Sequence, residues 1–360
     1  MFSCAAAASS SDRPSGACEQ PLNITCQDTV NGVATFDFTV SPSATSYMVT
    51  PIDPTGNQLV PSSISRPLGS AITFNGANRF QATPSQVFGN MNPTIIPATP
   101  DFVGQLEPGA HTYTVQSASE QMCWYKLEES QPGDSIDLNI YLVGLQGVNA
   151  ANAAQNANLQ ATLNHVNELY QAAGISLGKI RYFDASPAIA QNFAIVRNAD
   201  ALGDLVASTT KPGDTLDDVL SMNVFFVRGF ADGGTIGVSY GLPGPAGLHG
   251  TDGSGAVFTA EYMGGQTTDG LGVPVDGNLF TAQVLAHEVG HYLGLFHTSE
   301  QNGFNFDPLG DTPQCGRIAP NCPDIDNLMF PFASATGNTI TPNQAFVLGV
   351  NPLTKVGVAP

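Results

Sequence analysis

Apolar and polar residues alternate along several short segments in the first third of the chain. Residues 34–40 (ATFDFTV) show this most clearly, and a period of two is typical of a half-buried strand. Turn-forming Gly, Pro, Asn and Ser separate these segments. The segments that predict strands are 34–40, 46–50, 71–74 and 111–115. Short strands at this spacing predict a β-sandwich-like domain over residues 21–130.

A different pattern follows Gln131-Pro-Gly-Asp, which marks the predicted domain boundary. Residues 151–173 predict a helix, because apolar side chains recur there every three or four residues. Residues 222–228 (MNVFFVR) are almost continuously apolar, as in a buried strand. The other predicted strands are 136–143, 175–183 and 256–260, and the other predicted helices are 201–207, 279–293 and 340–348. This mixture predicts an α+β (mixed α/β) domain over residues 131–360.

The strongest candidate chemistry lies in the helix predicted at 279–293. His287 and His291 are four residues apart, so they project from one face of a helix and can bind the same metal ion. Glu288 follows the first histidine. Its carboxylate is placed to act as a general base toward water at that metal.

Gly294 and His297 extend this motif. A glycine can adopt positive φ without steric cost, so Gly294 can end the helix and turn the chain back. That turn would bring His297 to the metal as a third ligand. Three protein ligands leave one position open, which is typical of a catalytic zinc site; a structural site, the alternative, usually has a closed and cysteine-rich shell.

The full motif, HExxHxxGxxH, resembles that of the metzincin clan of zinc peptidases. The features that follow it resemble the pappalysin family more narrowly. They are an Asp-x-x-x-Asp-Thr-Pro segment at 307–313, a cysteine pair and Met329. The resemblance covers about the C-terminal half of the chain. It implies a metzincin-like catalytic domain that binds Zn²⁺ and hydrolyses peptide bonds in protein or peptide substrates.

The resemblance also implies roles for single residues. Met329 would form a hydrophobic base beneath the three histidines. The family often has a tyrosine two residues after this methionine, but this chain has Pro331, so no tyrosine is expected to assist from that position. Asp307 and Asp311 could hold Ca²⁺ together with loop carbonyls. The alternative is that this segment only forms a turn that orders the loop.

A glycine-rich segment at 234–244 occupies the place of the substrate-binding edge strand of metzincins. Such a strand has unpaired peptide groups that can bind an extended peptide. Ile236, Val238 and Tyr240 are the predicted positions of this strand. The alternative is a plain surface hairpin. His249, in the loop that follows, is expected to be solvated rather than to contact substrate.

The six cysteines permit three disulfides and 15 pairings. They are Cys4, Cys18, Cys26, Cys123, Cys315 and Cys322. The pair Cys315–Cys322 is favoured because it would close a short loop before Met329, and Cys26–Cys123 is a weaker prediction. Disulfides indicate an oxidising compartment. Cys4 is followed by a small-residue stretch, and residues 1–20 predict a flexible tether with a possible lipid anchor at Cys4.

The net charge of the chain limits the kinds of molecule that it is expected to bind. The chain has 11 Lys and Arg against 30 Asp and Glu, a formal net charge of −19. Such a charge argues against nucleic acid or anionic lipid as a partner, and no apolar run is long enough for a transmembrane segment. We therefore expect a secreted or cell-surface zinc endopeptidase, although no signal peptide precedes the tether. The alternatives are a non-catalytic cell-surface adhesion protein and a latent zymogen with residues 21–130 as its pro-domain; the oligomeric state stays open.

Overall fold

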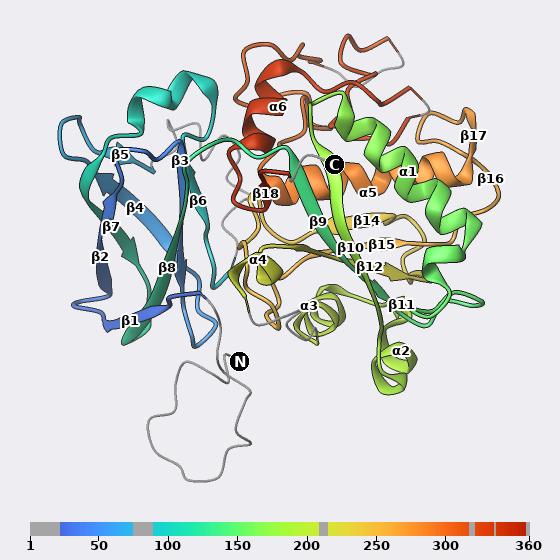
Figure 1. Cartoon of the computed structure of the whole chain (residues 1–360), viewed down its shortest axis with the longest axis horizontal. Coiled ribbons are helices and arrows are strands. Elements are labelled where there is room, and N and C mark those ends of the chain that lie inside the picture. The colour runs from blue at the N-terminus through green and yellow to red at the C-terminus, as the bar shows by residue number, and fades with distance from the viewer. Residues whose placement is uncertain (1–21, 75–88, 209–214, 317–320, 335, 358–360) are drawn as a thin grey trace.

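The computed structural model of this chain describes residues 22–74, 89–208, 215–316, 321–334 and 336–357 (Figure 1). Two groups of secondary structure lie side by side, one made of strands with a short 3₁₀ helix and one of strands and α-helices. The predicted tether, with Cys4 and Cys18, lies outside the described residues.

Two four-stranded sheets make up the N-terminal part. Their strand orders are β1-β8-β3-β6 and β2-β7-β4-β5. The bounds are β1 (Thr25–Asp28), β2 (Val33–Val40), β3 (Ser46–Ile52), β4 (Val60–Ser65), β5 (Ile72–Thr73), β6 (Thr94–Ile96), β7 (Gly109–Gln116) and β8 (Gln121–Glu129). Phe36 and Tyr113 of one sheet and Tyr47 of the other meet in one buried apolar cluster. The sheets therefore pack face to face, and the four predicted strands are among the eight described.

A mixed sheet forms the centre of the C-terminal part, in the order β10-β9-β12-β15-β14. Its strands are β9 (Ser135–Leu142), β10 (Ser176–Asp184), β12 (Met222–Val227), β14 (Gly237–Ser239) and β15 (Ala256–Thr259). Strands β9, β10, β12 and β15 run parallel to one another. Strand β14 is antiparallel to β15 and lies at the edge of the sheet. All residues of β9 and β12 are buried, which explains the nearly continuous apolar sequence of β12. The short strand β18 (Thr354–Lys355) pairs with β9.

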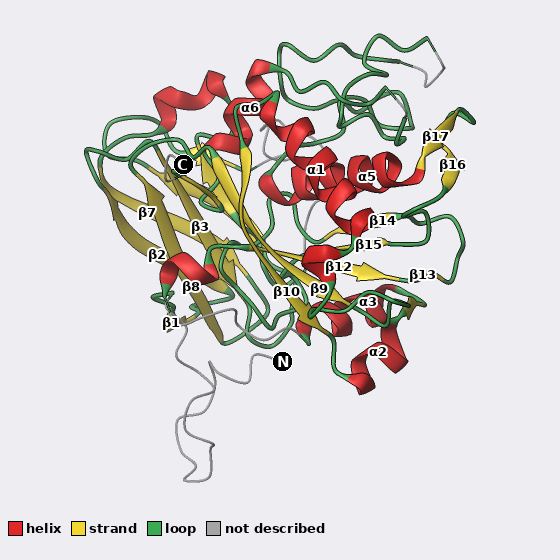
Figure 2. Cartoon of the chain, turned by 45° about the vertical axis from the view of Figure 1, so that its right-hand side comes forward, coloured by secondary structure: helices red, strands yellow, loops and turns green. Residues whose placement is uncertain are grey.

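Helices cover both faces of this sheet (Figure 2). Helices α1 (Ala157–Gln171) and α5 (Gly277–Leu293) pack together on one face, where the Tyr170 hydroxyl donates to the Ala286 carbonyl oxygen at 2.7 Å. Helix α3 (Ala199–Ala207) packs on the other face through Leu205 and Val206. The remaining elements are α2 (Pro187–Phe193), α4 (Leu216–Val219), α6 (Pro342–Gly349), β11 (Ile195–Val196), β13 (Gly229–Phe230), β16 (Gln266–Thr268) and β17 (Pro274–Asp276), with 3₁₀ helices at Pro100–Gln105 and Ala153–Gln155.

Helix boundaries follow side-chain caps. Helix α1 begins later than the predicted residue 151, because the Asn156 side chain accepts a hydrogen bond from the Leu159 N–H. Helix α6 begins after Thr341, two residues later than the predicted residue 340, because Thr341 forms a capping box with Gln344. In the part of the chain that the structure describes, no helix has both the length and the apolar character that a membrane span requires.

The two parts share one hydrophobic core. Met48, Ile52 and Tyr125 of the β1-β8-β3-β6 sheet belong to the same buried cluster as Leu248 and Tyr292 of the C-terminal part. Two buried hydrogen bonds cross the same contact. The Tyr125 hydroxyl donates to the Ala246 oxygen at 2.7 Å, and the Ser46 hydroxyl donates to the Val350 oxygen at 2.8 Å. This contact therefore resembles a domain interior more than a loose interface.

Two disulfides lie within the described residues. Cys26–Cys123 joins β1 to β8, and Cys315–Cys322 closes the loop before Met329. Both pairings correspond to those suggested by the sequence.

Candidate metal and active site

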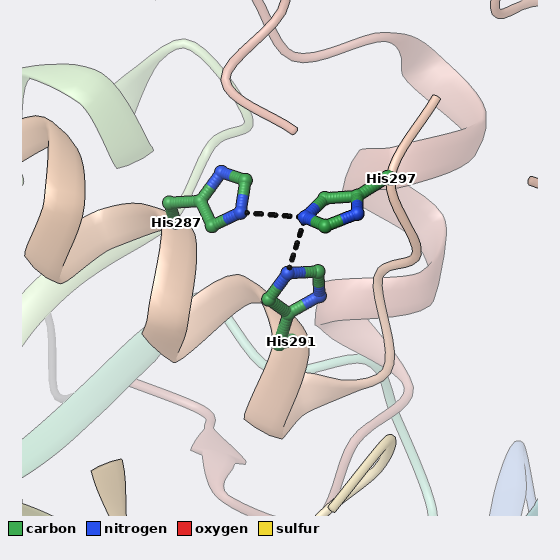
Figure 3. A group of neighbouring side chains, drawn as sticks. All are labelled: His287, His291 and His297. Atoms are coloured by element: carbon green, nitrogen blue, oxygen red, sulfur yellow. Dashed lines mark hydrogen bonds between the residues drawn. The ribbon is translucent and has the colours of Figure 1, made fainter. Parts of the chain in front are cut away.

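Helix α5 and the turn that ends it carry three histidines toward one point (Figure 3). His287 and His291 lie on successive turns of the helix. Gly294 ends it with φ of 112°, and its N–H and that of Leu295 bond back to the last turn. That left-handed residue redirects the chain, and His297 returns to face the other two histidines.

The three Nε2 atoms converge. The Nε2 atom of His297 lies 3.1 Å from that of His287 and 3.1 Å from that of His291. A tetrahedral zinc with bonds of about 2.0–2.1 Å would separate its nitrogen ligands by about 3.3 Å. The spacing therefore fits a metal ion bound to all three rings.

Hydrogen bonds at the opposite ring nitrogens orient the three rings. The Nδ1 atom of His287 lies 2.8 Å from the Leu328 oxygen, and that of His291 lies 2.7 Å from the Leu295 oxygen. Because a carbonyl oxygen only accepts, both Nδ1 atoms carry the proton and both Nε2 atoms keep a free lone pair. The Nδ1 atom of His297 lies 3.0 Å from Glu300 Oε2, which makes the same kind of bond.

Burial keeps the imidazoles of His287 and His291 neutral. It lowers the pKa of His287 to about 3 and also lowers the pKa of His291, with further repulsion from the neighbouring histidines. Two neutral rings protonated at Nδ1 cannot hydrogen-bond to each other through Nε2. A cation between the three rings would satisfy these nitrogens, and imidazole nitrogens suit zinc.

Glu288 is half-buried and directly follows the first of these histidines in the sequence. Burial raises the pKa of its carboxyl group to about 8, and the Ser239 N–H opposes that shift. A bound cation would favour the ionised form. The side chain thus lies next to one candidate metal ligand on α5 and close to Gly237 of β14.

Met329 lies beneath α5. It is fully buried, and a Cβ placed on Gly290 would lie 2.8 Å from its sulfur atom. Gly290 immediately precedes His291. Leu328, the residue before Met329, supplies the carbonyl acceptor for His287 Nδ1. The turn around Met329 therefore contacts the helix that carries two of the candidate ligands.

A buried carboxylate joins the segment after His297 to the segment before Met329. Asp324 Oδ2 accepts hydrogen bonds from the Thr298 and Ser299 hydroxyls, each at 2.7 Å. Two loops that are distant in sequence are thereby connected, and both contribute to the histidine cluster.

The two aspartates proposed for calcium have different surroundings. Asp307 is buried, accepts hydrogen bonds from Leu309 and Thr312, and has its pKa raised to about 7 by burial. Asp311 instead accepts from the Thr341 hydroxyl and from the Asn343 N–H, each at 2.9 Å. Asp311 thus binds the N-terminus of α6, which agrees with the alternative in which this segment orders the loop.

The segment predicted as a substrate strand forms β14 at the edge of the sheet. The Thr259 N–H donates to the Ile236 oxygen, and the Tyr240 N–H donates to the Gly255 oxygen. Because alternate residues of an antiparallel strand bond to the same side, the peptide groups of Ile236, Val238 and Tyr240 point into the sheet. Gly237 and Ser239 present their peptide groups to the open edge instead.

Several features of the site escaped the sequence reasoning. Glu300 is three residues beyond His297 in the sequence. A carboxylate at that spacing indicates a hydrogen-bond partner for the histidine ring. The carbonyl acceptors at Leu295 and Leu328 have no sequence signal at all. His249 was expected to be solvated, but it is buried between Asn223 and the Val219 carbonyl oxygen. That prediction was wrong because the loop packs inward.

The comparisons agree with a metal-dependent site. No family model matches the chain. An extracellular metalloprotease of Trichophyton verrucosum is 27% identical over 207 residues, and one of Arthroderma benhamiae is 26% identical over 207 residues; each match covers 53% of this chain and 68% of the relative. An extracellular metalloprotease of Arthroderma otae is 26% identical over 173 residues, 47% of this chain and 56% of the relative. Metalloproteinase II of Bacteroides fragilis shares 14% identity at a TM-score of 0.31, covering 60% of this chain and 52% of that one, which is too distant to carry an argument.

Proposed function

We propose that this chain is a zinc-dependent endopeptidase that acts outside the cell. One observation carries the proposal: the Nε2 atom of His297 lies within hydrogen-bond distance of the Nε2 atoms of His287 and His291, next to the half-buried carboxylate of Glu288. The relatives named extracellular metalloproteases support the same class. Two disulfides in the described residues support an oxidising environment.

His287, His291 and His297 would hold the zinc. When bound, a zinc ion supplies Lewis-acid chemistry, polarising a carbonyl and acidifying water. Glu288 accepts a proton from the attacking water at its carboxylate and delivers that proton to the nitrogen of the leaving amine. The open edge of β14 would bind the substrate as an extended strand through the peptide groups of Gly237 and the carbonyl oxygen of Ser239, since the Ser239 N–H faces Glu288.

Finer assignments belong to the same proposal. The order of the motif, the cysteine pair and Met329 supports membership of the pappalysin family.

A calcium ion at Asp307 is part of the proposal, since one of its carboxylate oxygens is buried without a hydrogen bond in the described part of the structure. Asp311 is not proposed as a ligand of that calcium ion, because both of its carboxylate oxygens accept hydrogen bonds from the start of α6.

The decisive test compares the wild type with Glu288→Gln, which keeps the size of the side chain and removes its basicity. Zinc content is measured by elemental analysis, and hydrolysis is measured on unfolded casein. We expect one zinc in both proteins. Chelator-sensitive cleavage should occur in the wild type and fall in Glu288→Gln by a factor of about 10²–10⁴, the usual contribution of a general base.

A third variant tests the ligand set. His297→Ala should lose zinc, because two imidazoles hold the ion less tightly than three. Unchanged zinc content in that variant would remove His297 from the site. Zinc in the wild type and Glu288→Gln with cleavage in neither would indicate the non-catalytic protein or the latent zymogen instead.

A further inference from the structure

Gly237 lies where the edge strand meets the proposed general base. Residue 237 pairs with Phe258 on β15, and its Cα faces helix α5. A Cβ added there would lie 2.7 Å from Glu288 Cγ, 2.9 Å from Glu288 Oε1 and 2.9 Å from Val284 Cγ1. Real Cβ atoms essentially never come within 3.0 Å of another heavy atom, so any side chain at 237 would displace Glu288.

The glycine is required here for space and not for backbone conformation. Many glycines of this chain have positive φ, including Gly241 on the same segment, but Gly237 does not. It lies in a regular antiparallel strand, where an alanine adopts the same backbone without strain. A substitution at 237 would therefore act through the atoms that its side chain meets.

A second group of the same strand faces the same carboxylate. The Ser239 N–H points to the open edge of β14 and lies near Glu288, whose pKa it lowers against the effect of burial. Together, the Gly237 Cα and the Ser239 N–H form a seat for the Glu288 side chain, which we call the β14 seat. One strand thus supports the base and presents peptide groups to an extended substrate.

We propose that Gly237 is a positioning residue for Glu288, with the β14 seat fixing the carboxylate relative to both the histidine cluster and a peptide bound along the edge. This inference rests on the proposed peptidase function and deepens it. A carboxylate displaced by about 1 Å would lose much of its ability to transfer the proton, since errors of that size can cost up to about 100-fold in rate.

The first test is Gly237→Ala, measured for zinc content, thermal stability, kcat and KM. We expect full zinc content and a kcat lower by about 10- to 100-fold, with KM changed by much less. The matched control is Gly229→Ala in strand β13, where an added Cβ meets its nearest atom at 3.6 Å, an ordinary contact. That variant should keep wild-type kcat. A Gly237→Ala enzyme with wild-type kcat and full zinc would overturn the proposal.

A second test does not depend on catalysis. Gly237→Ala is combined with Glu288→Ala, which removes the Cγ and Oε1 atoms that the new Cβ would meet. If the β14 seat is real, Gly237→Ala lowers the melting temperature by less in the Glu288→Ala background than in the wild type. Equal shifts in the two backgrounds would overturn the proposal. This cycle gives a result even if the wild type cleaves no peptide, so failure of the seat and failure of the peptidase function remain distinguishable.

Discussion

His249 is held neutral by its two ring partners. The Nε2–H group donates to the Val219 oxygen at 2.7 Å, so Nδ1 must accept from the Asn223 amide, also at 2.7 Å. Burial, together with a smaller effect of the Arg181 charge, lowers the pKa of this histidine to about 4. A proton on Nδ1 would break the bond from Asn223, which explains why the folded protein resists protonation there.

This pKa predicts loss of stability in acid. Between the ordinary value of 6.5 and about 4, the unfolded chain binds a proton that the folded chain does not, so the free energy of unfolding falls as pH falls. From pH 7.5 to 5 the loss from this residue should be about 2 kcal/mol. Urea unfolding of wild type and His249→Gln at both pH values, with chelator present, measures it. Because His287 and His291 are common to both proteins, equal pH dependence in the two would contradict this account.

Helix α5 ends where the third ligand must turn back, and this element depends on the conformation of Gly294. The φ of 112° is unfavourable for any residue with a side chain. A Cβ at this position would meet Val347 Cγ1 at 3.4 Å, an ordinary contact. A side chain at position 294 is therefore disfavoured by backbone conformation, whereas a side chain at position 237 is disfavoured by the atoms it would contact.

A series of substitutions at Gly294 tests whether its left-handed conformation places His297 after helix α5. Asn tolerates left-handed conformation better than Ala, and a β-branched residue tolerates it least. We expect zinc affinity and melting temperature to fall in the order Gly294, Gly294→Asn, Gly294→Ala, Gly294→Val, with Gly294→Ala costing about 1 kcal/mol or more of stability. Competition with a zinc chelator measures the affinity. Equal affinity across the series would show that the turn does not place His297.

At the scale of the whole molecule, the N-terminal sheets are packed as part of the same core. Met48 and Tyr125 belong to the same buried cluster as Leu248 and Tyr292, and Tyr292 follows His291 in the sequence. The hydrogen-bond acceptors of the three histidine Nδ1 atoms all lie between residues 295 and 328. The N-terminal part thus shares a core with α5 and supplies none of these acceptors. We propose that it supports the site from this side, whereas a pro-domain would be expected to cover the histidine cluster.

This arrangement predicts the effect of removing residues 1–130. The fragment 131–360 would expose the apolar surface around Leu248 and Tyr292, and we expect it to be insoluble or unable to bind zinc. As a control, a protease site inserted near Gln131 should allow cleavage of the linker, and the two pieces should still elute together on size exclusion. A soluble fragment that cleaves casein faster than the whole chain would identify the N-terminal part as a pro-domain.

Secondary structure and the convergence of the three histidines were largely predictable. The helix with His287 and His291, the capping of α6 and the buried strand β12 each depend on residues within about ten positions of one another. The later start of α1 was missed, because Asn156 and an earlier 3₁₀ turn compete locally with the helix. The strands β1, β4, β6 and β8 were missed, because their alternation is weak and their pairing is non-local.

The sequence by itself determined the spacing of the histidines and the glycine that turns the chain, because helical periodicity and left-handed backbone conformation are local properties. Only the tertiary structure decided that Leu328 orients His287, that His249 is buried and that Gly237 touches Glu288. Each of these contacts joins segments at least 26 residues apart. Their register depends on how the sheets, helix α5 and the loop before α6 pack together, and no local pattern encodes that packing.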